Sequence, residues 1–380
     1  MVLNYLIKVN IININIIYDY NAFSLQKFGG ITRYYTELNK IFNKNENIKS
    51  KIIAPIHQNY YLKNNKYNER FNIYLNRYPK YTKTFVENYN FYLSNILINF
   101  IKPKILHQTY YSERIFKFDK IKTKLILTVY DLIHEIFYKD FGFEKNYRPK
   151  LISLSQADHI ICISNKTKND LINFYNIPED KIEVIYLGCS RFDVKKNYEK
   201  NIFDFPYILF VGSRRRYKNF YNLLKAYSTS SKLKKDIKII CFGGEKFGVD
   251  ERKLLQTFGI SENQIIQIHG NDETLTALYK NAEAFIFPSI YEGFGLPILE
   301  SMKNNCPVIL SSIETFREVA GNSALYFDPL SSESIREKIE EVIYSDTKKL
   351  ILKKNGTERV KKFTWEKCAE DTLKIYQKII

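Results

Sequence analysis

The 380-residue chain lacks several features that would assign its class at once. It contains no run of eighteen apolar residues, so we expect no transmembrane helix. Its first twenty residues are apolar but interrupted by asparagines and a lysine, and they lack the cleavage site of a signal peptide. The five cysteines are scattered, and no Cys/His spacing suits zinc. These absences predict a cytoplasmic chain with reduced, buried cysteines and no metal site.

The formal net charge is +17, which suits nucleic acid, an anionic membrane or a phosphorylated substrate as a partner. Lys, Asn, Ile and Tyr are abundant throughout, however, which indicates a bias of the whole composition. No nucleic-acid-binding motif occurs, and the aromatic residues are spread along the chain instead of forming a stacking platform. A basic nucleic-acid-binding protein is therefore the weaker hypothesis, and we predict no nucleic-acid partner.

Short apolar runs alternate with longer helical patterns along most of the chain. This alternation is typical of parallel sheets wound by right-handed crossovers. A polar, aperiodic segment at 191–206 interrupts it, and we interpret this segment as a linker. The predicted fold class is α/β, with two Rossmann-like doubly wound parallel-sheet domains facing each other across a cleft that binds the ligand. The runs expected to form buried strands are 14–18, 104–107, 124–129, 159–163, 207–211, 237–242, 284–287 and 307–310.

A glycine-bearing loop joins the predicted strand 284–287 to the next helix. Glu292, Gly293 and Gly295 lie in this loop, and Pro297 suits the first helical position. The free N–H groups and positive dipole of such a helix start favour a diphosphate. We expect Glu292 and, in the first helical turn, Glu300 to accept hydrogen bonds from hydroxyl groups on either side of it. The alternative is a helix-dipole glutamate and a solvated loop glutamate.

A second loop, 211–219 (VGSRRRYKN), also follows a predicted strand and precedes a helix at 220–227. Arg214 and Lys218 would bring positive charge to a leaving diphosphate. The chain has no Asp-x-Asp pair with which to hold a divalent metal. Neutralisation by Arg and Lys therefore predicts a metal-free site, with a solvated basic loop as the alternative.

A basic and aromatic segment, 77–101, allows two interpretations. One is a patch that associates peripherally with the inner face of an anionic membrane, and the other is a core helix after a solvated loop. Its apolar residues follow helical spacing after Arg77, Lys80 and Lys83: Phe85, Val86, Tyr89, Tyr92, Leu93, Ile96, Leu97 and Phe100.

The ordered motifs resemble the family 4 retaining glycosyltransferases (glycosyl transferases group 1), which have the GT-B fold. In the second half the resemblance is carried by E-x7-E at 292–300 within PSIYEGFGLPILESM, VGSRRRYKN at 211–219, HGNDETLTALYKNAEAFIFPS at 269–289 and FTWEK at 363–367. In the first half it is carried by FSLQKFGGITRY at 23–34, LHQTYY at 106–111 and TVYDLIHE at 128–135. It covers nearly the whole chain.

The resemblance implies an acceptor-side domain at 1–190, the linker, a nucleotide-sugar-binding domain at 207–362, and a helix at 363–380 that crosses back to the first domain. It implies that Glu300 binds the ribose hydroxyls, that Glu292 contacts the donor sugar, and that Arg214 and Lys218 neutralise the diphosphate. The remaining donor-binding residues that it implies are Gly29, Gly30, Gly212, Gly293, Phe294, Gly295 and Leu296.

The TVYD segment departs from the family at one position. Relatives often have histidine immediately before the aspartate, and here that position is Tyr130. We expect Asp131 and His134 near the reacting sugar; the alternative for His134 is a structural histidine at a helix start. The residues His107, Tyr110 and Tyr130, near strand ends, either line an acceptor pocket or serve the structure.

The function implied by the resemblance is retaining hexose transfer in polysaccharide biosynthesis, without a cofactor. The donor would be GDP-mannose or a UDP-sugar, with mannose as the first choice, and the acceptor a glycan or a lipid-linked oligosaccharide. The alternative, motivated by Tyr130, is a GT-B protein that binds sugar nucleotides with weak turnover.

Overall fold

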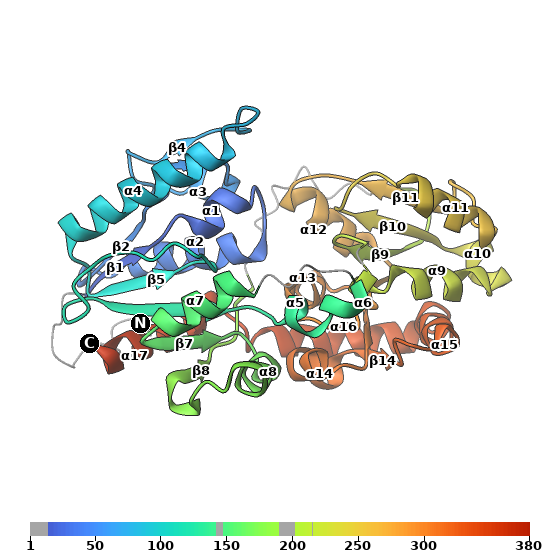
Figure 1. Cartoon of the computed structure of the whole chain (residues 1–380). Helices are drawn as coiled ribbons and strands as arrows, with labels where there is room; N and C mark the ends of the chain where they lie inside the picture. Colours follow the sequence, from blue (N-terminus) through green and yellow to red (C-terminus); the bar gives the residue numbers. More distant parts are fainter. Residues whose placement is uncertain (1–13, 142–146, 190–201, 215) are drawn as a thin grey trace.

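A computed structural model describes residues 14–141, 147–189, 202–214 and 216–380, which form two α/β domains (Figure 1). Each domain is built on a six-stranded sheet whose neighbouring strands all run parallel. In both sheets the chain adds strands to one side of the first strand and then to the other, as in doubly wound folds. The predicted fold class is confirmed.

The sheet of the first domain has the strand order β2-β1-β5-β6-β7-β8. A separate two-stranded sheet, β3 with β4, accompanies it. The strands are β1 (Ile14–Tyr18), β2 (Ile48–Ile52), β3 (Ile56–His57), β4 (Ile73–Tyr74), β5 (Ile105–Gln108), β6 (Lys124–Val129), β7 (His159–Cys162) and β8 (Ile182–Val184). The α-helices are α1 (Asn21–Leu25), α2 (Gly30–Phe42), α3 (Tyr60–Lys63), α4 (Lys83–Ile101), α5 (Ile133–Ile136), α6 (Tyr138–Phe141), α7 (Arg148–Gln156) and α8 (Asn165–Tyr175).

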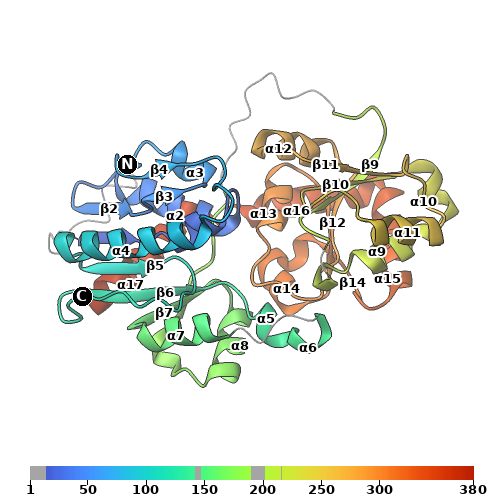
Figure 2. The same ribbon diagram turned by 45° about the horizontal axis from the view of Figure 1, so that its top comes forward.

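The sheet of the second domain has the strand order β11-β10-β9-β12-β13-β14. Its strands are β9 (Tyr207–Val211), β10 (Lys238–Phe242), β11 (Ile265–Ile268), β12 (Ala284–Phe287), β13 (Val308–Ser311) and β14 (Leu325–Phe327). The α-helices are α9 (Phe220–Ser228), α10 (Ser231–Asp236), α11 (Val249–Thr257), α12 (Asp272–Asn281), α13 (Leu296–Lys303), α14 (Glu314–Ala320), α15 (Ser332–Ile343), α16 (Asp346–Val360) and α17 (Trp365–Ile379). Figure 2 shows helices on both faces of each sheet.

The inner strands of both sheets read as apolar runs because helices cover both of their faces. Every residue of β9, β12 and β13 is buried, for example. All eight predicted strands are confirmed to within two residues. The strands that were not predicted within the two large sheets are the four edge strands, β2, β8, β11 and β14. An edge strand has one unpaired side and needs less apolar sequence, as the alternating buried and exposed residues of β2 (IKSKI) illustrate.

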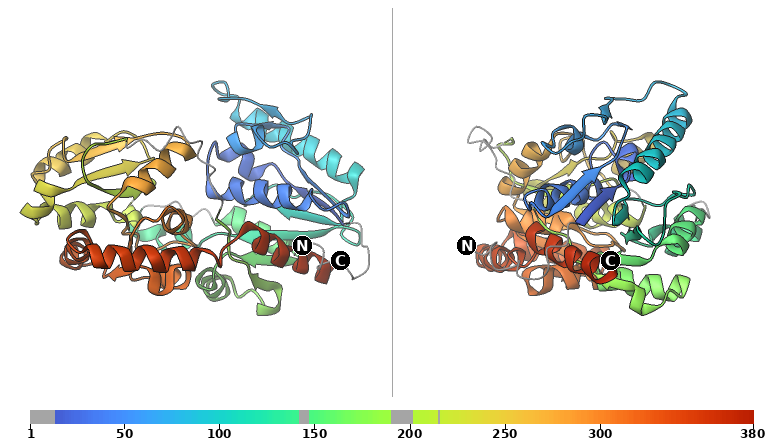
Figure 3. Two further views of the ribbon diagram at one scale, coloured as in Figure 1. Left: turned by 180° about the vertical axis from the view of Figure 1, so that it is seen from behind. Right: turned by 90° about the vertical axis from the view of Figure 1, so that its left-hand side faces the viewer.

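The last helix, α17, leaves the second domain and packs on the first. Viewed from behind, the chain runs from α16 in the second domain to α17 beside α2 (Figure 3). Trp365, the first residue of α17, stacks on Tyr34 of α2 with ring centroids 6.2 Å apart. Farther along, the Tyr376 hydroxyl hydrogen-bonds His107 Nδ1 of β5 over 2.6 Å. The apolar stripe of this helix is thus buried against the other domain.

Most of the predicted linker, 191–206, lies outside the described residues. Within the described part, the first large sheet ends at Val184 and the second begins at Tyr207. All five cysteines are free and buried, as predicted. None of the helices in the described ranges is both long enough and apolar enough to cross a membrane.

Candidate active site

The loop after β12 turns into α13 at the interface between the domains. Gly295 takes a φ of +97°, a conformation that suits glycine, and the helix begins one residue later with proline at its second position. Gly293 meets the first domain so closely that an added Cβ would lie 1.7 Å from the Tyr130 carbonyl oxygen. The loop therefore fits against the first domain only if this position is glycine.

Glu300 is the fifth residue of α13, so the prediction that it lies in the first helical turn is wrong. Its side chain is buried, and its carboxylate faces the first domain. Arg33 of α2 donates from Nη1 to Glu300 Oε1 over 2.6 Å. From the second domain, the Tyr279 hydroxyl donates to Glu300 Oε2 over 3.3 Å. The carboxylate that was predicted to bind ribose thus already has a partner in each domain.

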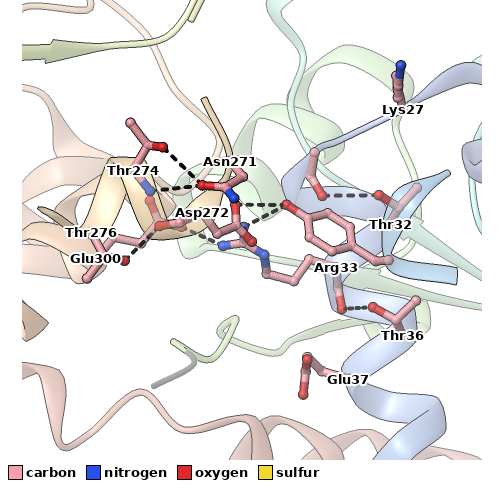
Figure 4. Close-up of polar contacts among 12 residues, drawn as sticks. Lys27, Thr32, Arg33, Thr36, Glu37, Asn271, Asp272, Thr274, Thr276 and Glu300 are labelled. Atoms are coloured by element: carbon pink, nitrogen blue, oxygen red, sulfur yellow. Dashed lines mark hydrogen bonds and ion pairs between the residues drawn. The ribbon is translucent and has the colours of Figure 1, made fainter. Parts of the chain in front are cut away.

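Arg33 also holds a second carboxylate. Its Nη2 donates to Asp272 Oδ2 over 2.9 Å and to the Tyr61 hydroxyl over 2.7 Å. Tyr61 in turn donates to Asp272 Oδ1 over 3.3 Å. Figure 4 shows the Arg33 side chain reaching from α2 to Asp272, at the start of α12, and to Glu300. One guanidinium therefore bridges the two domains.

Burial and charge act in opposite directions on the Arg33 guanidinium. Burial by itself lowers its pKa, but the charge of Glu300 and then Asp272 more than offsets this, so the pKa is raised overall. For Tyr61, burial raises the pKa to about 12, despite the nearby Arg33 charge. Arg33 is thus a permanent cation between two carboxylates.

The second predicted glutamate, Glu292, lies in the loop and faces Lys218. Lys218 Nζ donates to Glu292 Oε1 over 2.5 Å and lies 5.0 Å from the centre of the Phe287 ring. The Thr315 hydroxyl donates to the Glu292 carbonyl and fixes the loop from behind. Glu292 and Lys218 were predicted from two separate motifs, and the structure brings them together.

Arg214 follows the same strand as Lys218 but turns to a different neighbour. Its Nε donates to Glu251 Oε1 of α11 over 2.5 Å, and its guanidinium lies 4.5 Å from the Phe247 ring centre. Although burial raises the pKa of Glu251, the hydrogen bond from Arg214 brings it below its usual value overall. Within the described part of the chain, buried Arg214 Nη1 has no hydrogen-bond acceptor. Nη1, which lies beside Gly244, therefore remains available for an anion.

The first domain contributes the N-terminus of α2 and the segment after β6. Gly29 precedes α2, and an added Cβ on Gly30 would lie 2.7 Å from Leu296 Cδ1. Asp131 lies beside Gly293 and accepts a hydrogen bond at its carbonyl from Lys150 Nζ over 2.8 Å. His134 is exposed on the short helix α5. Gly30, Leu296, Gly293 and Asp131 thus meet at the interface.

Two acceptor-side predictions are corrected by burial. His107 is fully buried, and its two ring nitrogens hydrogen-bond Tyr376 and Thr128, so it lies in the core instead of lining a pocket. The Tyr130 side chain also points into the first domain, where its hydroxyl lies within hydrogen-bonding distance of the Tyr35 hydroxyl (2.7 Å) and of the Thr109 carbonyl oxygen (3.0 Å). Tyr110 is partly exposed and stacks on Tyr130 with ring centroids 6.3 Å apart.

Four residues of the site were not predicted: Arg33, Tyr61, Asp272 and Tyr279. Arg33 and Asp272 stand in motifs that carry the resemblance, in the first turns of α2 and α12. The sequence feature that could have identified them is a charged residue near the start of a helix that faces the predicted cleft. Their pairing across 239 positions of sequence was not readable from either motif.

The chain matches two families of known proteins, one in each half. Residues 28–191 match "Glycosyltransferase Family 4", and residues 190–359 match "Glycosyl transferases group 1". It is 30% identical over 235 residues to O-antigen chain mannosyltransferase B of Escherichia coli, an alignment that covers 59% of this chain and 62% of that protein. It is 29% identical over 260 residues to O-antigen chain mannosyltransferase RfbU of Salmonella typhimurium, covering 67% and 69%. The chain thus spans about two thirds of the length of these relatives.

Among solved structures, the chain is similar to Anabaena Alr3699/HepE in complex with UDP and glucose. The superposition has a TM-score of 0.70, covers 96% of this chain and 100% of that chain, and has 13% sequence identity. This likeness over the full length shows that the two domains have the GT-B arrangement.

Proposed function

The chain belongs to the family 4 glycosyltransferases of the GT-B fold, and we propose that it transfers a hexose, with retention, from a nucleotide-diphosphate sugar to a glycan or lipid-linked acceptor. The observation that carries this proposal is the start of α13. There, Glu292 precedes and Glu300 follows the first turn of the helix, so the two carboxylates flank the positive end of the helix dipole. A nucleotide-diphosphate sugar fits this arrangement, because its diphosphate lies between the ribose hydroxyls and the sugar hydroxyls.

The proposed donor is GDP-mannose, with a UDP-sugar as the alternative. Support for mannose comes from the two relatives, both of which are named mannosyltransferases. Support for uridine comes from the UDP and glucose bound to the solved HepE structure. Glu300 would take the ribose hydroxyls and Glu292 the hydroxyls of the sugar.

The proposed chemistry uses the acceptor hydroxyl as the nucleophile. Its oxygen bonds to the anomeric carbon on the face from which the diphosphate leaves, and its proton passes to the departing phosphate oxygen. Charge on that phosphate would be stabilised by the buried Nη1 of Arg214, by Lys218 and by the N-terminus of α13. This set of cations supports a reaction without a metal. We expect transfer to continue in the presence of EDTA, and loss of transfer that Mg²⁺ or Mn²⁺ restores would contradict it.

A panel of nucleotide sugars tests the activity. We expect one donor to be consumed, with slow hydrolysis when no acceptor is present, and Glu300→Gln should weaken its binding about tenfold or more. Glu333→Gln, at an exposed position of α15, is the matched control. Consumption of no donor would refute the activity, and binding without turnover would favour the sugar-nucleotide-binding alternative.

For the acceptor, we propose that the protein works at an anionic membrane surface. The support comes from α4, which packs on the core through Val86 and Ile98 and exposes other apolar residues on its outer face. Its buried face includes Asn90, which hydrogen-bonds the backbone of Ile56, and Ser94. Its outer face carries Phe85 (68% exposed), Tyr92 (65%) and Phe100 (83%), with Tyr89 and Ile96 between them. The predicted stripe is therefore divided: Val86 is buried and Leu97 packs against the core, whereas these five residues are exposed.

Charge around α4 favours an anionic partner. Segment 77–122 holds nine Lys and Arg residues against three Asp and Glu. A helix of 19 residues is about 28 Å long, enough to lie in the surface of a bilayer with a row of aromatic side chains inserted. A lipid-linked acceptor would be held at such a surface, close to the first domain.

Vesicle sedimentation tests the membrane proposal. We expect binding to vesicles that contain phosphatidylglycerol, little binding to pure phosphatidylcholine, and release by salt. The triple variant Phe85→Ser, Tyr92→Ser, Phe100→Ser should lose binding. As a control, Val249→Ser, Leu330→Ser, Leu350→Ser changes three equally exposed apolar residues of the second domain. Equal binding by the two triple variants would refute the role of α4.

A further inference from the structure

Arg33 crosses the domain interface to the carboxylate that the proposed function assigns to the donor ribose. It starts from α2 in the first domain and ends on Glu300 and Asp272 in the second. Only 11% of its side chain and 8% of that of Glu300 are exposed. Because Arg33 belongs to the opposite domain, the surroundings of the Glu300 carboxylate depend on where the first domain lies.

We propose that Arg33 is a positioning residue for donor binding: by holding Glu300 across the interface, it sets the carboxylate for the ribose hydroxyls and completes the nucleotide site only when the two domains are together. This inference rests on the proposed function, because it takes the ligand of Glu300 to be a nucleotide. It assigns to the first domain a part in recognising the nucleotide.

The hydrogen-bonding capacity of Glu300 supports this role. An ionised carboxylate can accept about four hydrogen bonds. Arg33 occupies one position on Oε1, and Tyr279 occupies one on Oε2. The remaining positions match the two neighbouring hydroxyls of a ribose. Arg33 fixes the rotation of the carboxylate, so that the ribose does not have to order it.

Charge gives Arg33 a second effect on the same site. Glu300 and Asp272 together carry two negative charges near the proposed diphosphate, and both contact the Arg33 guanidinium. Without this cation, the two carboxylates would repel each other and the donor phosphates. Lysine is a poor substitute, because a single ammonium does not offer the planar fork that reaches both carboxylates and the Tyr61 hydroxyl.

Helix α2 couples this contact to the other side of the loop. Gly30 begins α2 and touches Leu296, and Arg33 lies three residues later in the same rigid helix. The Arg33 amide donates to the Gly29 carbonyl. The Thr36 hydroxyl donates to the Arg33 carbonyl, as Figure 4 shows. Any separation of the domains would therefore withdraw Gly30 and Arg33 together.

Calorimetric titration with GDP, 2′-deoxy-GDP, UDP and 2′-deoxy-UDP tests the proposal. We expect the wild-type protein to bind one ribonucleotide about tenfold or more tightly than its deoxy counterpart. Arg33→Met should weaken both nucleotides, because the uncompensated carboxylates repel their phosphates, but it should weaken the ribonucleotide more and so reduce the preference to about twofold. Arg33→Lys, which keeps the charge and most of the side-chain bulk, should not restore it.

Lys27→Met is the matched control, since it removes another positive charge just before α2 and leaves the carboxylates untouched. It should keep the wild-type preference. A variant in which both nucleotides are weakened equally, so that the preference stays at its wild-type value, overturns the role of Arg33 and leaves it a structural residue. Wild-type protein that binds none of the four nucleotides refutes the proposed function itself, which separates the two failures.

Discussion

The ion pair between Arg33 and Glu300 should contribute measurably to the stability of the domain interface. We consider Arg33→Met, Glu300→Gln and the double variant. Removing one partner from a buried pair costs about 3–5 kcal/mol, because the other charge is left buried without compensation. Arg33→Met leaves two carboxylates without their cation, whereas Glu300→Gln leaves the guanidinium paired with Asp272. The arginine variant should therefore be the less stable of the two.

Urea unfolding measures this effect, and the single tryptophan of the chain provides a local probe. Trp365, the first residue of α17, is buried against Tyr34 of the first domain. Its fluorescence therefore reports whether α17 stays packed on that domain. Circular dichroism should give the same transition if the domains unfold together. We expect the double variant to be more stable than the sum of the single effects predicts, by about 1–3 kcal/mol. Effects that add to within about 0.5 kcal/mol would refute the coupling.

Two further predictions concern the core and the loop. Burial lowers the pKa of His107 to about 3, so the folded state requires its neutral form. The contribution of this residue to stability is therefore fully present above the unfolded pKa, which is near 6.5. As the pH falls from about 6.5 towards 3, that contribution is lost at about 1.4 kcal/mol per pH unit. His107→Gln should make the free energy of unfolding fall less steeply between pH 6 and pH 4, while His57, whose pKa burial lowers to about 4, keeps part of the slope. Exposed His269→Gln should leave the slope unchanged, and equal slopes in the two variants would contradict the assignment. Gly293→Ala should force its loop away from the Tyr130 carbonyl, lower stability by about 1–3 kcal/mol and weaken donor binding. Gly248→Ala, whose added Cβ would only reach an ordinary contact with Glu251 Oε2 at 3.9 Å, should do neither, and wild-type donor affinity in Gly293→Ala would contradict the close contact.

The fold was predictable because its inner strands are recognisable as short apolar runs. A strand covered by helices on both faces must be apolar at almost every position, as β9 (YILFV) is. The edge strands are under no such constraint: β2 (IKSKI) alternates apolar residues with lysines, and β14 has only three residues. The short apolar run of β11 (IIQI) was missed. The helix α4 was predicted as a helix, but its orientation was not. Helical spacing shows that Phe85, Tyr92 and Phe100 share a face and does not say whether that face is inside.

In the loops of the candidate site, too, local features were predictable from the sequence and contacts between distant residues were not. A glycine-bearing turn, a proline and a helix after a strand are local features, and they suffice to predict an anion site near Gly293 and Gly295. Which carboxylate pairs with which cation is not local. Both cations were predicted to meet phosphate, and the contact of Lys218 with Glu292 and that of Arg214 with Glu251, on the other side of β9, were not predicted.

The amino-acid pattern alone was enough to establish two parallel-sheet domains and the family, because strand burial and short motifs depend on neighbours along the chain. Only the folded chain decided that Arg33 and Glu300, which are 267 residues apart, share one hydrogen bond. Such a contact depends on how two domains meet, and that geometry results from many weak packing contacts spread over both. No short stretch of residues encodes it.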